Sequence, residues 1–136
     1  MHQPSRTRER AVRRAPREVR AGFPSPAQDY YSGPVDLNRH LMRDPTTTFV
    51  LRVSGDSMTG AGIFDGDEVL VDRGLDAHDG SVVVAVVNGE FTLKRLRQRD
   101  GATSLEAEHP AYPPIVMTPE DDLVIWGVVT RCLHRV

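Results

Sequence analysis

From residue 46 onwards, short apolar runs alternate with polar residues and are separated by glycine and aspartate. An alternation with a period of two places successive side chains on opposite faces of a β-strand. Between two of these runs lies Asn88-Gly89, whose residues tolerate the positive φ angles of a tight type I′ hairpin turn. The pattern predicts a mainly β body, with strands at Thr48–Ser54, Glu68–Asp72, Ser81–Val87, Phe91–Arg97, Thr103–Glu106 and Leu123–Leu133.

The residues before this body have a different character. Residues 1–20 hold seven Arg and two Glu, a net charge of +5, whereas the rest of the chain holds ten basic and seventeen acidic residues, a net charge of −7. Since residues 1–20 contain almost no apolar side chains that could be buried, we expect a mobile tail. Three roles are open for this tail: a solvated charged segment, a contact for nucleic acid or protein, or an organelle transit peptide.

A short stretch between the tail and the body carries further local signals. Two prolines between residues 21 and 26 favour an extended conformation, and residues 36–42 suit a short helix with Asp36 near its start. We therefore divide the chain into a basic tail (1–21), an extended arm (22–45) and a β-rich domain (46–136).

Length and composition limit the classes of function. A chain of 136 residues suits one compact domain and excludes a large multidomain enzyme. It has no run of about 18 apolar residues, as a membrane span requires, and its Arg-rich start lacks the apolar core of a secretory signal. The single cysteine, Cys132, allows neither an internal disulfide nor a cysteine-rich zinc site. We expect a cytoplasmic protein that needs no metal or cofactor.

Sixteen of the seventeen basic residues are arginine, and the remaining one is Lys94. Arginine keeps its proton near neutral pH, whereas the pKa of a buried lysine falls by roughly 3 to 5 units, so that its amine becomes a base. Upstream, Ser57 follows a predicted strand, with Gly55 allowing an unusual turn. Because a serine hydroxyl needs a base to act as a nucleophile, Ser57 and Lys94 are the candidate catalytic pair. The alternative to a catalytic role is that Lys94 is an ordinary exposed lysine and that Ser57 belongs to a Gly-Asp-Ser turn without catalytic function. The apolar residues expected around the pair are Met58, Ile63 and Val69.

Other candidate sites have less support. A Ser-His-Asp triad needs a histidine near the serine, and we interpret the histidines as surface residues: His2, His40, His78, His109 and His134. The acidic segment 65–68 is similar to a calcium loop, but Leu70 stands where the twelve-residue pattern needs glycine, so we predict a turn. Cys132 lies in an apolar run and is interpreted as a packing residue rather than a reactive thiol.

Three motifs occur together in this chain: Ser-Gly-Asp-Ser-Met at Ser54–Met58, Gly-Ile-Phe-Asp-Gly-Asp at Gly62–Asp67 and Gly-Glu-Phe-Thr-Leu-Lys-Arg-Leu at Gly89–Leu96. With the spacing of thirty-seven residues between Ser57 and Lys94, they closely resemble the LexA/UmuD family of self-cleaving Ser/Lys peptidases. The UmuD branch is the most similar, because three further segments look like its arm and its last strand: Gly22–Ala27, Val35–Asn38 and Trp126–Val129.

This resemblance implies a fold and a site. The fold is a curved antiparallel β body of the LexA/signal-peptidase type with a mobile N-terminal arm. Ser57 is the nucleophile and Lys94 its general base. The scissile bond is Ala21-Gly22, and the backbone amides of Asp56 and Ser57 stabilise the oxyanion. The residues suit these roles, since Ala21 is small enough for a tight pocket and Gly22 approaches a serine without a β-carbon clash.

The resemblance also implies a role in DNA repair and SOS mutagenesis. A RecA filament on single-stranded DNA stimulates the self-cleavage. The trimmed homodimer, residues 22–136, then serves as accessory subunit of the error-prone translesion polymerase V, whose catalytic subunit is UmuC-like. The chain departs from the UmuD branch at Ala21, where cysteine is frequent, and in its Arg-rich tail. The alternatives are a non-catalytic DNA- or protein-binding module, a LexA-like repressor fragment, and a leader peptidase, which the lack of a membrane anchor argues against.

Overall fold

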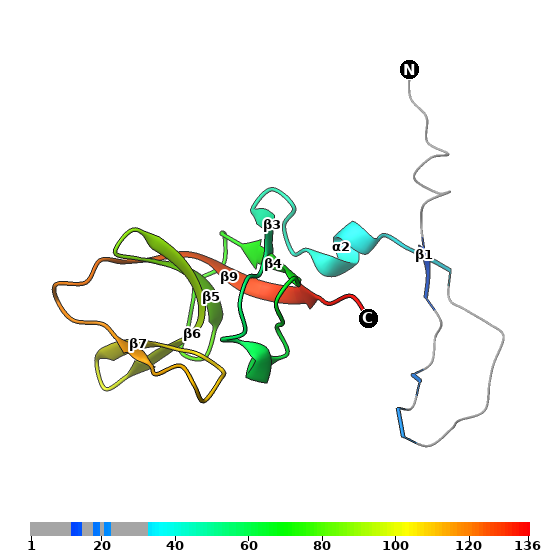
Figure 1. The fold of residues 1–136 in the computed structure, drawn as a ribbon. Coiled ribbons are helices and arrows are strands. Elements are labelled where there is room, and N and C mark those ends of the chain that lie inside the picture. Colours follow the sequence, from blue (N-terminus) through cyan, green and yellow to red (C-terminus); the bar gives the residue numbers. More distant parts are fainter. Residues whose placement is uncertain (1–11, 15–17, 20, 23–32) are drawn as a thin grey trace. The chain divides into compact units, whose positions relative to one another are not determined.

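The computed structural model describes residues 12–14, 18–19, 21–22 and 33–136 (Figure 1). The chain divides into two compact units, residues 1–43 and 44–136. In the first unit, the short strands β1 (Val12–Arg13) and β2 (Pro34–Val35) pair antiparallel, an element that the sequence did not predict. Most of the tail and arm for which we expect mobility lies outside the described residues.

The first unit also contains the helix α2 (Leu37–Leu41). Asp36 caps its start, because the carboxylate of Asp36 accepts hydrogen bonds from the backbone N–H groups of Asn38 and Arg39 at 3.1 and 3.4 Å. The predicted short helix is therefore present and begins at the predicted cap. In the described part of the chain, no helix combines the length and the apolar character that crossing a lipid bilayer requires.

The second unit is a seven-stranded antiparallel sheet with the strand order β3-β4-β9-β5-β6-β7-β8 (Figure 1). Its strands are β3 (Thr48–Arg52), β4 (Glu68–Asp72), β5 (Val82–Val87), β6 (Glu90–Arg99), β7 (Ala102–Glu106), β8 (Ile115–Val116) and β9 (Leu123–Leu133). The predicted mainly β, antiparallel body is confirmed, and β4 and β9 have the predicted bounds. The two-residue strand β8 was not predicted.

The hairpin between β5 and β6 sets the position of Lys94. Asn88 and Gly89 have φ angles of 49° and 83°, so both adopt the positive φ that the type I′ turn requires. The predicted hairpin is confirmed. Its register places Val83 opposite Lys94, four residue pairs from the pair that closes the turn, Val87 and Glu90.

Two irregularities in the pairing of β9 bend the sheet. Against β4, the register shifts between Leu70 and Val71, and against β5 it shifts between Val84 and Ala85. An extra residue in one strand of an antiparallel pair bends that strand and increases its twist. The sheet in Figure 1 is accordingly curved.

Apolar side chains pack into two clusters in this unit. The first consists of Met58, Ile63, Val69, Val71 and Val84, and the second of Val83, Ala85, Leu96 and Leu105. Strand β5 contributes to both clusters, because its successive side chains point to opposite faces of the sheet. The proposed nucleophile, Ser57, directly precedes Met58 of the first cluster.

Candidate active site

The turn that carries Ser57 begins at the end of β3. Val53 continues the pairing beyond the strand, since its N–H donates to Asp67 O and its carbonyl accepts from Gly66 N–H, both at 2.8 Å. Gly55 then turns with a φ of 99°, and its N–H donates to Asp65 Oδ1 at 2.7 Å. The acidic segment 65–68 therefore acts as the predicted turn, and it also holds the start of the serine turn.

The residues after Ser57 anchor the other end of this turn. Met58 is only 2% exposed and belongs to the first core cluster. It also precedes the single-turn 3₁₀ helix η1 (Thr59–Ala61), which was not predicted. Ser57 itself is partly buried, so its hydroxyl lies at the edge of the core rather than in open solvent.

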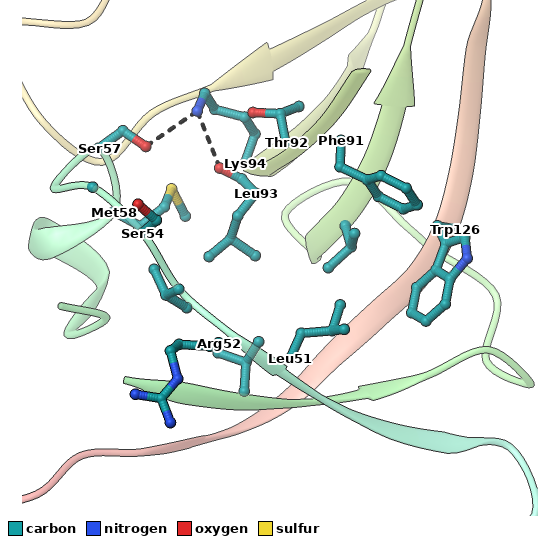
Figure 2. Close-up of a pocket in the computed structure, with 14 residues that line it drawn as sticks. Leu51, Arg52, Ser54, Ser57, Met58, Phe91, Thr92, Leu93, Lys94 and Trp126 are labelled. Carbon is teal, nitrogen blue, oxygen red and sulfur yellow. Dashed lines mark hydrogen bonds between the residues drawn. The ribbon is translucent and has the colours of Figure 1, made fainter. Parts of the chain in front are cut away.

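Lys94 reaches this hydroxyl from β6. Its Nζ donates hydrogen bonds to Ser57 Oγ at 3.1 Å and to Leu93 O at 3.2 Å (Figure 2). The side chain is partly buried, and this burial lowers the pKa of Lys94 below its ordinary value, because a charged amine loses hydration there. The two candidate residues, thirty-seven positions apart in the chain, are thus in direct contact.

A pocket of about 450 Å³ opens beside this pair (Figure 2). Its lining is mostly apolar and includes Leu51, Val53, Met58, Val69, Val84, Phe91, Leu93 and Trp126. Of the apolar residues expected near the pair, Met58 and Val69 line the pocket, and Ile63 packs in the same core cluster. The pocket provides the water-poor surroundings that a neutral lysine needs.

The wall opposite the serine is built on the bulge in β9. Val84 faces Gly127 and Ala85 faces Ile125, which leaves Trp126 as the extra residue of β9. The Trp126 ring packs edge-on against Phe91, with ring centroids 6.1 Å apart. Composition and periodicity gave no signal for this aromatic wall, although both residues lie in motifs that carry the family resemblance.

The backbone around Ser57 offers hydrogen-bond donors. Within the described residues, the N–H group of Ser57 donates to no other protein group, whereas that of Asp56 interacts with the carboxylate of its own side chain. The same carboxylate has two further partners, since Oδ1 accepts a hydrogen bond from the Tyr112 hydroxyl at 2.6 Å and Oδ2 lies 3.7 Å from His109 Nε2. The bond from Tyr112 lowers the pKa of Asp56. Sequence reasoning missed both partners, because no local pattern connects residues so far apart.

Among the described residues, the side chains of Cys132 and His134 contact Asp67 rather than Ser57, and His2 lies outside the described residues. His134 is exposed, as expected for a surface residue, and its Nδ1 lies 2.6 Å from Oδ1 of Asp67, a carboxylate that is only 4% exposed. Cys132 Sγ donates to Asp67 Oδ2 at 3.3 Å, and burial, followed by this bond, raises the pKa of its thiol to about 11. The interpretation of Cys132 as a packing residue agrees with its contacts to the first core cluster.

The proposed scissile residues lie in the first unit. Ala21 and Gly22 are both exposed and form a bend. Among the described residues, no three His, Cys, Asp or Glu side chains gather in a way that could hold a metal ion.

Comparisons with known proteins identify the family of this chain. Residues 14–130 match the Peptidase S24-like family. Over 118 residues the chain is 45% identical to Protein MucA of Salmonella typhimurium, an alignment that covers 85% of this chain and 79% of MucA. It is 42% identical over 121 residues to Protein ImpA of Escherichia coli, with 85% and 78% coverage. It is 43% identical over 104 residues to LexA repressor 2 of Pseudomonas putida, with 73% and 52% coverage.

These matches and the antiparallel fold define a serine peptidase domain of the self-cleaving, LexA-like class. The chain belongs to the Peptidase S24-like family. Its similarity to MucA and ImpA, each over most of both chains, confirms the UmuD-like assignment and with it an accessory role in SOS mutagenesis.

Proposed function

We propose that Ser57 and Lys94 are the catalytic dyad of this peptidase and that it cleaves its own chain between Ala21 and Gly22. The observation that carries the proposal is the 3.1 Å contact between Lys94 Nζ and Ser57 Oγ beside an apolar pocket. The lowered pKa of Lys94 supports it, because only a neutral amine can accept the hydroxyl proton.

In the first step, Ser57 Oγ attacks the carbonyl carbon of Ala21 while Lys94 Nζ takes the hydroxyl proton. The negative charge that develops on the carbonyl oxygen is stabilised by the backbone N–H groups of Asp56 and Ser57, each typically worth about 3 to 4 kcal/mol. The tetrahedral intermediate then expels the nitrogen of Gly22, which leaves with the proton from Lys94. Residues 1–21 remain attached to Ser57 as an ester.

In the second step, Lys94 removes a proton from a water molecule, which attacks the ester carbonyl. The bond between Ser57 Oγ and Ala21 breaks, and the serine oxygen regains a proton from Lys94. The products are the basic tail, residues 1–21, and the trimmed chain, which keeps the arm (22–45) and the β-rich domain (46–136).

The length of the chain between the scissile bond and Ser57 does not limit this reaction. Gly22 and Ser57 are thirty-five residues apart, a segment that spans over about 100 Å when extended, so chain length does not prevent the encounter. A tethered substrate has an effective concentration on the order of mM. Slow cleavage then requires either that the arm lies away from Ser57 for most of the time or that Lys94 keeps its proton for most of the time.

The proposed partners follow from the UmuD-like assignment. A RecA filament on single-stranded DNA accelerates the slow self-cleavage, and the trimmed homodimer binds the UmuC-like catalytic subunit of a translesion polymerase. The similarity to MucA and ImpA supports this role. A time course of self-cleavage with and without the filament tests the first partner, and co-purification of the trimmed chain with the polymerase subunit tests the second.

The dyad is tested with the purified full-length protein at about pH 10, where more of the amine is neutral. Mass spectrometry should detect residues 1–21 and 22–136 as products. Ser57→Ala and Lys94→Ala should abolish both, whereas Ser104→Ala, on β7, where Ser104 pairs with Arg97 rather than with Lys94, should leave them unchanged. A folded parent protein that shows no break after Ala21 would falsify the proposal.

A further inference from the structure

A residue beyond the end of β7 holds the turn that carries Ser57. The backbone N–H of Glu108 donates to Ser57 O, and the carbonyl of Glu108 accepts from Gly60 N–H, both at 2.8 Å. At Gly60 there is no room for a side chain, since a β-carbon would lie 2.6 Å from Glu108 O. The turn from Ser57 to Gly60 is therefore paired at both of its ends with one residue.

The side chain of Glu108 contacts the strand that carries Lys94. Its Oε1 accepts a hydrogen bond from Arg95 Nε at 2.5 Å, and the two side chains are 31% and 25% exposed. Arg95 directly follows Lys94 on β6, and its Nη1 donates to Gly80 O at 2.6 Å. Glu108 thus connects the serine turn, through its backbone, to the lysine strand, through its carboxylate.

We propose that Glu108 is a positioning residue of this peptidase, whose side-chain hydrogen bond from Arg95 keeps the Ser57 turn aligned with Lys94. The inference rests on the proposed function above. A partly exposed ion pair contributes little to the stability of a whole domain. A displacement of about 1 Å at the reacting atoms, in contrast, slows a reaction by as much as about 100-fold. Loss of the pair should therefore affect the rate of cleavage much more than the unfolding transition.

The same two strands offer a matched control. Arg97 Nε donates to Glu106 Oε2 at 3.1 Å, and these side chains are 26% and 36% exposed, close to the values for Arg95 and Glu108. In the described part of the chain, no hydrogen bond of Glu106 or Arg97 reaches the Ser57 turn. Replacing Glu106 therefore removes an ion pair similar to that of Arg95 and Glu108, but it changes no contact of the Ser57 turn.

The experiment measures the first-order rate of self-cleavage and the thermal midpoint of four full-length proteins: the parent, Glu108→Ala, Glu108→Gln and Glu106→Ala. We expect Glu108→Ala to cleave about 10- to 100-fold more slowly than the parent and Glu106→Ala to stay within about twofold, with similar midpoints. Glu108→Gln keeps the length and an oxygen acceptor for Arg95, so it should recover most of the lost rate.

The other outcomes contradict the inference. If the parent cleaves and Glu108→Ala cleaves as fast as Glu106→Ala, Glu108 does not position the dyad, although the dyad itself stands. The same conclusion follows if Glu108→Gln is as slow as Glu108→Ala, or if the loss of rate accompanies a much lower midpoint than that of Glu106→Ala. A folded parent that does not cleave overturns both proposals.

Discussion

Replacing Lys94 with arginine separates the positive charge of this side chain from its ability to lose a proton. The ordinary pKa of lysine is 10.5, and burial lowers it in this pocket, whereas the pKa of arginine lies at least about two units above that of lysine. Well below both values, the neutral fraction of a base falls tenfold for each unit by which its pKa rises. Arginine therefore offers at least about 100-fold less neutral base, even before the effect of burial is included. Self-cleavage of Lys94→Arg should slow by at least this factor.

The assay follows the appearance of the trimmed chain by mass spectrometry at about pH 9, with sampling extended to days for slow variants. Arg99→Lys makes the reverse exchange at the exposed end of β6 and should cleave within about twofold of the parent rate. Circular dichroism must show that all variants are folded. If Lys94→Arg cleaves as fast as the parent, proton loss from this amine is not needed and the reasoning is refuted.

Lys94→Met should raise the thermal midpoint near pH 7, because burial lowers the pKa of Lys94 and so penalises its charged form in the folded state. This penalty declines as pH rises and is gone above 10.5, where the unfolded lysine is neutral too, so a difference in midpoint that persists there contradicts the pKa argument. Gly60→Ala should destabilise the fold by about 1 to 3 kcal/mol in a denaturant titration and slow cleavage, because its β-carbon would crowd Glu108 O. Tyr112→Phe should move the pKa of Asp56 upwards towards 3.8 in an NMR titration, since the hydrogen bond from Tyr112 is the largest influence that lowers it.

The strands of the second unit were predictable because their signals are local. Alternating side chains flanked by Gly and Asp gave β4 and β9 their bounds, and Asn88-Gly89 gave the hairpin between β5 and β6. A second signal of the same kind was overlooked, since Asp100-Gly101 also adopts positive φ angles, 53° and 76°, between β6 and β7. The two-residue strands β1, β2 and β8 are too short to show any period.

The candidate site was predictable only in its chemistry. The single lysine pointed to a base, and the serine motif pointed to a nucleophile. Glu108 contacts Ser57 and Tyr112 contacts Asp56, residues fifty-one and fifty-six positions away in the chain, and these contacts depend on tertiary structure that no local pattern encodes. His134 is exposed, as predicted, but its contact with Asp67 was missed for the same reason, because the two residues are sixty-seven positions apart.

The contact between Ser57 and Lys94 depends on the curvature of the sheet. Strands β4, β9 and β5 lie between β3 and β6, and with a spacing of about 4.8 Å between neighbours, the axes of β3 and β6 would be about 19 Å apart in a flat sheet. Ser57 lies only five residues beyond the end of β3, and its Oγ is 3.1 Å from Lys94 Nζ, a contact that a curved sheet favours because it brings β3 and β6 closer together. Both register shifts of β9 lie between these two strands, and bulges are the features that bend and twist a sheet. Removing the bulge at Trp126 would therefore separate the serine from the lysine without altering either residue.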